Sequence, residues 1–159
     1  MNNAQQLASR FREVILNGTF IANTNYRHQL DCTDWQLATH QVGQLNTIAV
    51  LAQHIHYYIA GVLQVLRGGS LDIKDKYSFN FAAITSQQQW DDILKRMWND
   101  AEAFVELVEQ LGPDQLDSPF TDPKYGTYYR NIDGMIEHCY YHLGQIALLK
   151  KMLIQIAPE

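Results

Sequence analysis

Two histidines near the C-terminal end of the chain have a spacing that suits metal binding. His138 and His142 lie four residues apart in IEHCYYHLGQ, and on a helix this spacing brings both imidazoles onto one face. Both can then share one divalent ion at about 2.0–2.1 Å each. Glu137 precedes His138 instead of following it, so the HExxH helix of zinc proteases is excluded. A lone His-x-x-x-His pair is also common among surface or hydrogen-bonded core histidines, and that reading stays open.

A metal site on this pair needs a further ligand from another part of the chain, and His54 is the best candidate. It lies near the middle of a second apolar segment, next to Leu51, Ile55 and Tyr58. Three neutral imidazoles with an open fourth position are typical of catalytic metal sites, not of structural ones. Such an ion can acidify a bound water or polarise a substrate oxygen.

Other polar residues are candidates for the surroundings of this site. Gln145 follows His142 by one helical turn, so it either orients a ligand, a water or a substrate, or is a polar residue at the rim. Tyr58 either lines a cavity or packs as an amphipathic side chain. Glu137 points about 100° away from the pair and is expected in a surface salt bridge.

Two connections are expected near the mouth of the site. Tyr129 and Arg130 enter the last helix within two turns of His138, and Arg130 is suited to a carboxylate or phosphate. The alternative is an ordered loop held by aromatic packing and an Arg–acid pair. Lys76 and Tyr77, in DKYSF, are expected at the same mouth.

The remaining histidines and the cysteines have simpler interpretations. His56 points away from the cluster, and His28 and His40 are expected to be hydrogen-bonded or exposed. Cys32 and Cys139 are far apart and form no CxxC motif, so a reducing, cytoplasmic location is the simpler expectation. Cys139 is interpreted as a small buried hydrophobe before it is considered as a ligand.

Helical periodicity predicts the elements that position these residues: an all-α, four-helix bundle with two longer connections, forming one domain over residues 1–159. The segment 19–34 is expected to be irregular, with a short helical piece from Thr33 or Asp34 through Ala38. The third long helix has aromatic residues, among them Trp90, Trp98 and Phe104, that either fill the core or contribute to a dimer interface. The long helices are predicted at 4–17, at 43–67, from 85 or 86 to the Gly112-Pro113 pair, and at 131–156.

The bulk composition excludes several classes of protein. The chain has 159 residues, 47% of them hydrophobic and 18% charged, which is an ordinary globular balance. A net charge of −5 argues against nucleic-acid binding. No uninterrupted apolar run approaches the roughly 20 residues of a membrane span, and the N-terminus lacks the features of a signal peptide.

Several phrases of the sequence resemble the DinB-like (DinB/YfiT) superfamily. They are NTIAVLAQHIHYYIAGVL, DKYSF, KYGTYYRNI and IEHCYYHLGQIALLKK, in this order, and the resemblance extends over residues 21–154. It implies a four-helix bundle, often a homodimer, with one divalent ion, nickel or zinc, on His54, His138 and His142. All three of the expected positions are histidine here.

What the resemblance implies about chemistry is broader. Some members of the superfamily are thiol-dependent transferases that use mycothiol, bacillithiol or glutathione, and others have no assigned reaction. The expectation is therefore a metalloenzyme with thiol-dependent transferase or hydrolase chemistry and a small-molecule or thiol co-substrate. The rival interpretation is a non-enzymatic bundle that binds a small ligand or acts as a dimer scaffold.

Overall fold

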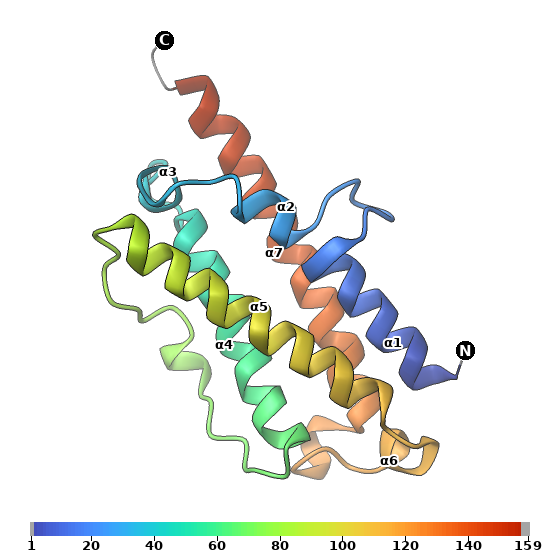
Figure 1. Cartoon of the computed structure of the whole chain (residues 1–159). Coiled ribbons are helices and arrows are strands. Elements are labelled where there is room, and N and C mark those ends of the chain that lie inside the picture. The colour runs from blue at the N-terminus through green and yellow to red at the C-terminus, as the bar shows by residue number, and fades with distance from the viewer. Residues whose placement is uncertain (1, 157–159) are drawn as a thin grey trace.

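Four long helices contain most of residues 2–156, the part of the chain that the computed structural model describes (Figure 1). No strand occurs among these residues, which confirms the predicted all-α bundle. The elements in chain order are α1 (Asn3–Arg12), the π-helical turn η1 (Glu13–Asn17), α2 (Tyr26–Leu30), α3 (Trp35–Thr39), α4 (Ile48–Leu66), the 3₁₀ turn η2 (Asp75–Tyr77), α5 (Gln87–Glu109), α6 (Pro113–Asp117), the 3₁₀ turn η3 (Pro123–Tyr125) and α7 (Tyr128–Ile156).

The start of α4 differs from the prediction because a hydroxyl group caps it. The helix begins at Ile48, five residues after the expected Gly43. The Thr47 side chain accepts a hydrogen bond from the backbone N–H of Val50 at 3.2 Å and so satisfies one free N–H of the first turn. Leu45, which lies within the predicted range 43–67, precedes the helix and is 54% exposed.

The other long helices also differ from the prediction mainly at their ends. The predicted first helix consists of α1 followed by the π-helical turn η1. Helix α5, expected from 85 or 86, begins at Gln87 after the capping residue Ser86, whose Oγ accepts from the Gln89 N–H at 3.3 Å. The Gln89 side chain in turn accepts from the N–H of Thr85. The last helix, α7, begins at Tyr128, three residues before the expected Asn131.

Two short helices lie where none was predicted. The segment 19–34, expected to be irregular, contains α2, which Asn25 caps by accepting from the N–H of His28 at 2.8 Å. Tyr26 and Leu30 of α2 are fully buried, one turn apart. Two apolar residues in a polar segment are too weak a periodic signal to reveal such a helix. Helix α6 follows α5 and begins at Pro113, a favoured first helical residue.

The core lies between the long helices. Helix α1 packs on α5, where Phe11 and Phe104 stack with ring centroids 4.3 Å apart. Trp90 is also fully buried and donates its indole N–H to the carbonyl of Thr33 at 2.8 Å. Trp90 and Phe104 therefore fill the core and are not at a dimer surface. Trp98 is partly buried, and its indole N–H donates to a carboxylate oxygen of Asp31 at the end of α2. The buried face of α5 follows the helical period and consists of Trp90, Ile93, Leu94, Met97, Ala101, Phe104, Val105 and Val108.

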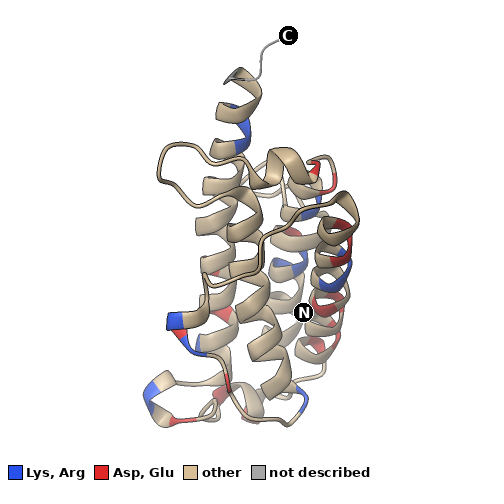
Figure 2. Cartoon of the chain, turned by 90° about the vertical axis from the view of Figure 1, so that its left-hand side faces the viewer, with Lys and Arg blue, Asp and Glu red and all other residues tan. Residues whose placement is uncertain are grey.

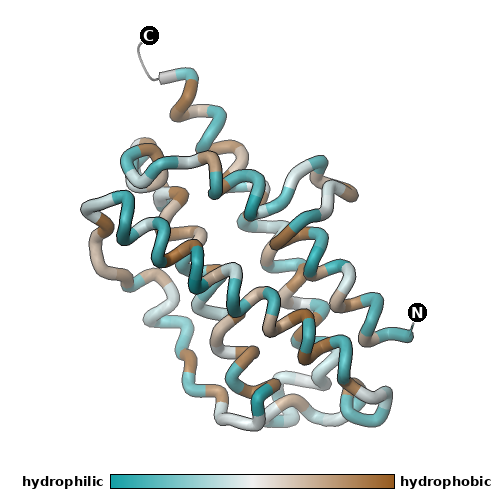
Figure 3. The backbone as a smooth tube through the Cα atoms, viewed as in Figure 1, coloured by the Kyte–Doolittle hydropathy of each residue, from teal (hydrophilic) through white to brown (hydrophobic). Residues whose placement is uncertain are grey.

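Charge is distributed unevenly over the bundle. Charged residues gather along α5 and at the lower connections (Figure 2), and α5 alternates hydrophilic and hydrophobic residues along its length (Figure 3). Helix α4 contains no charged residue. It is the one described helix long and apolar enough to cross a membrane, and 61% of its most apolar window is buried within the bundle, as is typical of a core helix.

The segment 70–85, which connects α4 to α5, runs back along α4 (Figure 1). The backbone N–H of Lys74 donates to the hydroxyl of Tyr57 at 2.9 Å. Ile73 lies so close to Gly61 that a β-carbon added there would be 2.6 Å from the Ile73 Cδ1 atom. The absence of a side chain at Gly61 thus lets the segment approach α4 and reach the middle of that helix, where His54 lies.

Candidate metal centre

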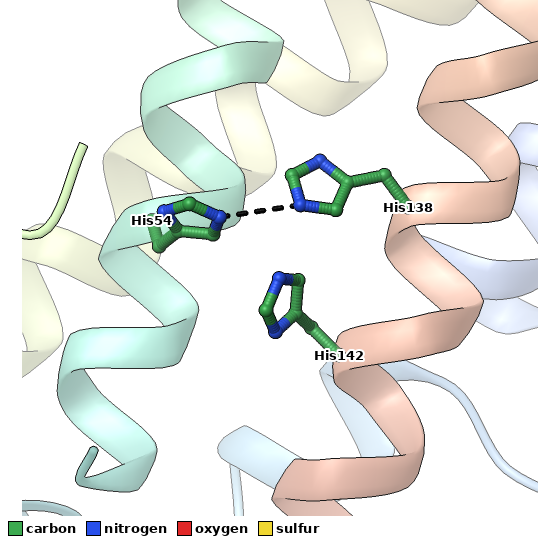
Figure 4. A group of neighbouring side chains, drawn as sticks. All are labelled: His54, His138 and His142. Atoms are coloured by element: carbon green, nitrogen blue, oxygen red, sulfur yellow. Dashed lines mark hydrogen bonds between the residues drawn. The ribbon is translucent and has the colours of Figure 1, made fainter. Parts of the chain in front are cut away.

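Three imidazoles from two long helices converge on one point. His54 lies in the middle of α4, and His138 and His142 lie one turn apart on α7, which packs beside α4 (Figure 4). The Nε2 atoms of His54 and His138 are 3.2 Å apart. The ring of His142 lies 4.7 Å from each of the other two rings, measured between centroids. Each residue offers a ligand atom within 4.8 Å of the others, so the structure brings together the three histidines singled out in the sequence.

The Nδ1 atoms of two of these rings, which face away from the cluster, are hydrogen-bonded to oxygen atoms. His54 Nδ1 lies 2.8 Å from the carbonyl oxygen of Ser78, and His142 Nδ1 lies 2.7 Å from Oε1 of Gln145. Both oxygens can only accept, so each Nδ1 carries the proton and each Nε2 presents a lone pair. Histidines that bind metals are oriented in this way, with the second N–H donated to an oxygen.

The three histidines are biased toward the neutral form, which is the form that binds a metal. Burial, together with the proximity of His142 and His54, lowers the pKa of His138 to about 4. Burial also lowers the pKa of His54 and of His142, against the opposing effect of their hydrogen bonds to Ser78 and Gln145. All three imidazoles are therefore available as lone-pair donors at neutral pH.

The segment 70–85 covers one side of the cluster. Phe79 stacks on the ring of His54 with centroids 3.9 Å apart and an angle of 11° between the planes. Tyr58 meets both His54 and His138 edge-on, and its hydroxyl donates to a carboxylate oxygen of Asp75 at 2.8 Å. Phe79 is 47% exposed, so it separates His54 from solvent. Tyr58 was a candidate from the sequence, whereas Asp75 and Phe79 were not singled out within DKYSF.

Within DKYSF, the residues expected at the mouth of the site differ from those that contact it. Tyr77 is 48% exposed, and the ammonium group of Lys76 lies over its ring at 4.7 Å. Contact with His54 comes from Ser78 and Phe79 instead. The backbone turn that continues from η2 through Ser78 and Phe79 decides which side chains face α4. So short a segment has no periodic pattern from which this could be predicted.

Of the residues expected around His138 and His142, the structure places one, Gln145, in contact with them. Gln145 bonds His142 and so orients one of the three imidazoles. Arg130 pairs with Glu137 at 3.1 Å on the exposed surface, the salt bridge expected for that glutamate. Tyr129 is 38% exposed. Within residues 2–156, no hydrogen bond, ion pair or ring contact connects Tyr129 or Arg130 to the three histidines.

The other histidines and Cys139 lie apart from the centre. His56 Nε2 contacts a carboxylate oxygen of Asp100 at 2.7 Å, on another face of α4. His28 Nδ1 is 2.9 Å from the hydroxyl of Thr24, and His40 is exposed. Cys139 is fully buried, and burial raises the pKa of its thiol far above the ordinary value, so it acts as a small hydrophobe.

Comparison with known proteins now adds to this geometry. The sequence model of the DinB superfamily matches residues 24–146. The chain belongs to the DinB superfamily. The matched region contains all three histidines and the segment 70–85, and it agrees with the resemblance that the motifs indicated. No curated protein and no solved structure matches the chain.

Proposed function

We propose that this DinB-superfamily protein binds one divalent metal ion through the Nε2 atoms of His54, His138 and His142. The observation that carries the proposal is the convergence of three neutral imidazoles. On two of them, His54 and His142, an oxygen acceptor holds the Nδ1–H group, as is typical of metal-binding histidines. Imidazole suits several late first-row ions, and nickel and zinc are the ions we propose.

The residues around the three imidazoles favour a centre with an open position. A divalent ion on three histidines keeps a free coordination position and acts there as a Lewis acid toward a water or a thiol. Phe79 covers the face of His54 and limits the access of water from that side. Gln145 fixes the ring of His142, and Asp75 holds the hydroxyl of Tyr58 beside the cluster.

Thiol-dependent transfer is the reaction that we propose to test first, followed by hydrolysis. This order rests on membership of the superfamily, and a fold by itself does not fix a reaction. A transferase predicts saturable binding of a thiol and a lowered pKa of that thiol when it is bound. A binding module or dimer scaffold, the rival function, predicts neither.

The first experiment is elemental analysis of untagged protein by inductively coupled plasma mass spectrometry. We expect about one nickel or zinc ion per chain in the wild type, and loss of the ion in His54→Ala and in His142→Ala. The matched control is His56→Ala, which removes a histidine of the same helix that bonds Asp100 instead. Helical circular dichroism of every variant establishes that the bundle persists. A wild type that holds no ion after loading and dialysis would refute the proposal.

A further inference from the structure

An apolar hollow of about 290 Å³ lies between the N-terminal part of α4 and the C-terminal half of α7, and one of its lining residues, Gln145, is hydrogen-bonded to His142. Its lining is mainly aliphatic, with two amide side chains among it. The residues that line it are Leu45, Asn46, Leu51, Gln145, Leu148, Leu149 and Met152.

The hollow adjoins the cluster on both helices. Leu51 precedes His54 by three residues on α4, and Gln145 follows His142 by three residues on α7, so each is about one turn from a histidine. Gln145 belongs to both places, because it lines the hollow while its Oε1 atom accepts from His142 Nδ1 at 2.7 Å. The hollow therefore begins about one helical turn from the cluster on both helices, within reach of the apolar part of a ligand whose polar head is at the cluster.

The chemistry of the hollow selects an uncharged, apolar group. None of its lining residues is charged, α4 contains no charged residue, and α7 contains none from His138 to Leu149. Leu51 and Leu149 are buried and form the interior, whereas Leu45 and Leu148 are 54% and 61% exposed at the rim. Aliphatic side chains exposed beside a concave site gain free energy when an apolar group covers them.

The polar groups of the hollow are few. The amide NH₂ group of Gln145 has no hydrogen-bond partner among the described residues, and Asn46 is exposed. Ligand pockets are typically apolar with a small number of such groups that fix orientation. One carbonyl or ether oxygen between the head and the apolar part of a ligand would match the free donors of Gln145.

We propose that this hollow is the specificity site of the protein, and that it binds the uncharged alkyl or aryl part of a substrate whose polar head occupies the metal centre. The inference rests on the proposed metal function. A cavity of about 150 Å³ is large enough for benzene, so this hollow accommodates a chain of roughly six to eight carbons or a substituted ring.

The test is a chain-length series of n-alkyl hydroxamic acids with two, four, six and eight carbons, titrated calorimetrically into zinc-loaded protein. The hydroxamate head is common to all of them, so the slope of affinity against chain length reports on the hollow alone. We expect affinity to rise by up to about fourfold per methylene, as for burial of a CH₂ group, and to level off when the hollow is full. Leu148→Ser should reduce this slope.

Ile154→Ser is the matched control, because Ile154 is a similarly exposed aliphatic residue of α7, at 58%, outside the hollow. Equal affinity for all chain lengths, or an equal slope in the wild type and in Leu148→Ser, would overturn the inference. Zinc content measured on the same samples separates this result from failure of the metal proposal, in which no ion is retained. A flat series together with a dimer that Leu148→Ser dissociates in sedimentation would assign the hollow to a second copy of the chain and would also overturn the inference.

Discussion

Replacement of Gln145 by leucine should weaken metal binding while the fold persists. His142 is only 6% exposed, so its Nδ1–H group depends on Gln145 for a hydrogen-bond acceptor. Without metal, His142 in the variant can move its proton to Nε2 and avoid the loss. When Nε2 binds a metal the proton must stay on Nδ1, where it is buried without an acceptor.

The size of the effect follows from that unpaired donor. A buried donor without a partner costs about 1–3 kcal/mol, which corresponds to roughly a 5- to 150-fold loss of metal affinity. Loss of a group that orients a metal-binding histidine typically costs about 10- to 100-fold, which lies within the same range. Gln145→Glu keeps an oxygen acceptor, so we expect it to bind metal at least as tightly as the wild type.

The assay is competition for zinc with a chromophoric chelator, performed on wild type and variants at equal pH. Gln88→Leu is the control, because this exposed glutamine of α5 bonds Asp92 far from the cluster in sequence and fold. Equal zinc affinity in Gln145→Leu and the wild type would refute the idea that Gln145 orients His142. Equal weakening in Gln145→Leu and Gln145→Glu would refute the tautomer argument in particular.

Three further outcomes are expected. Burial raises the pKa of the Cys139 thiol far above its ordinary value of 9.0, so the unfolded chain loses this proton at a lower pH than the folded one. The free energy of unfolding should therefore fall as the pH rises above about 9, by up to ~1.4 kcal/mol per pH unit. Urea denaturation of Cys139→Ala should lack this pH dependence. Gly61→Val, which adds atoms within 2.6 Å of the Ile73 side chain, should lower stability by about 1–3 kcal/mol and also weaken zinc binding, and unchanged binding would show that the segment 70–85 does not support the centre. Arg130→Gln should change stability and zinc affinity by less than about 0.5 kcal/mol because its ion pair is exposed, and a tenfold loss of zinc affinity would instead assign Arg130 to the site.

The grouping of His138 and His142 could be predicted because the helix is periodic. A spacing of four residues places His138 and His142 on one face whatever else the chain does. The long helices were predicted for the same reason, since apolar positions recur with the helical period, as they do on the buried face of α5. His54 is 84 or more residues from its partners, so it could be named only as the best candidate from its place in an apolar helix, and the resemblance to the superfamily added to that choice among six histidines.

Gln145 could be singled out by its spacing from His142, but the groups that the segment 70–85 brings to the three histidines could not be predicted in the same way. Ser78 contributes a backbone carbonyl, which every residue type has, so its identity carries no signal. Phe79 reaches His54 only because the segment 70–85 turns back along α4, and that path depends on contacts such as the one between Ile73 and Gly61. Helix α2 was missed for a related reason, because two buried residues in a polar segment acquire meaning only from the core they enter.

The two oxygen acceptors, the Ser78 carbonyl and Gln145 Oε1, therefore depend on different parts of the structure. Gln145 is on α7 with His142, so that pair is internal to one helix and moves with it. The acceptor for His54 lies on a segment outside the long helices, and it reaches His54 only when that segment packs against α4. A ligand that displaces Phe79 would thus disturb the orientation of His54 and leave that of His142 intact. Substitutions in the segment 70–85 should consequently affect metal binding and access to the centre together, whereas substitutions in α7 can separate the two.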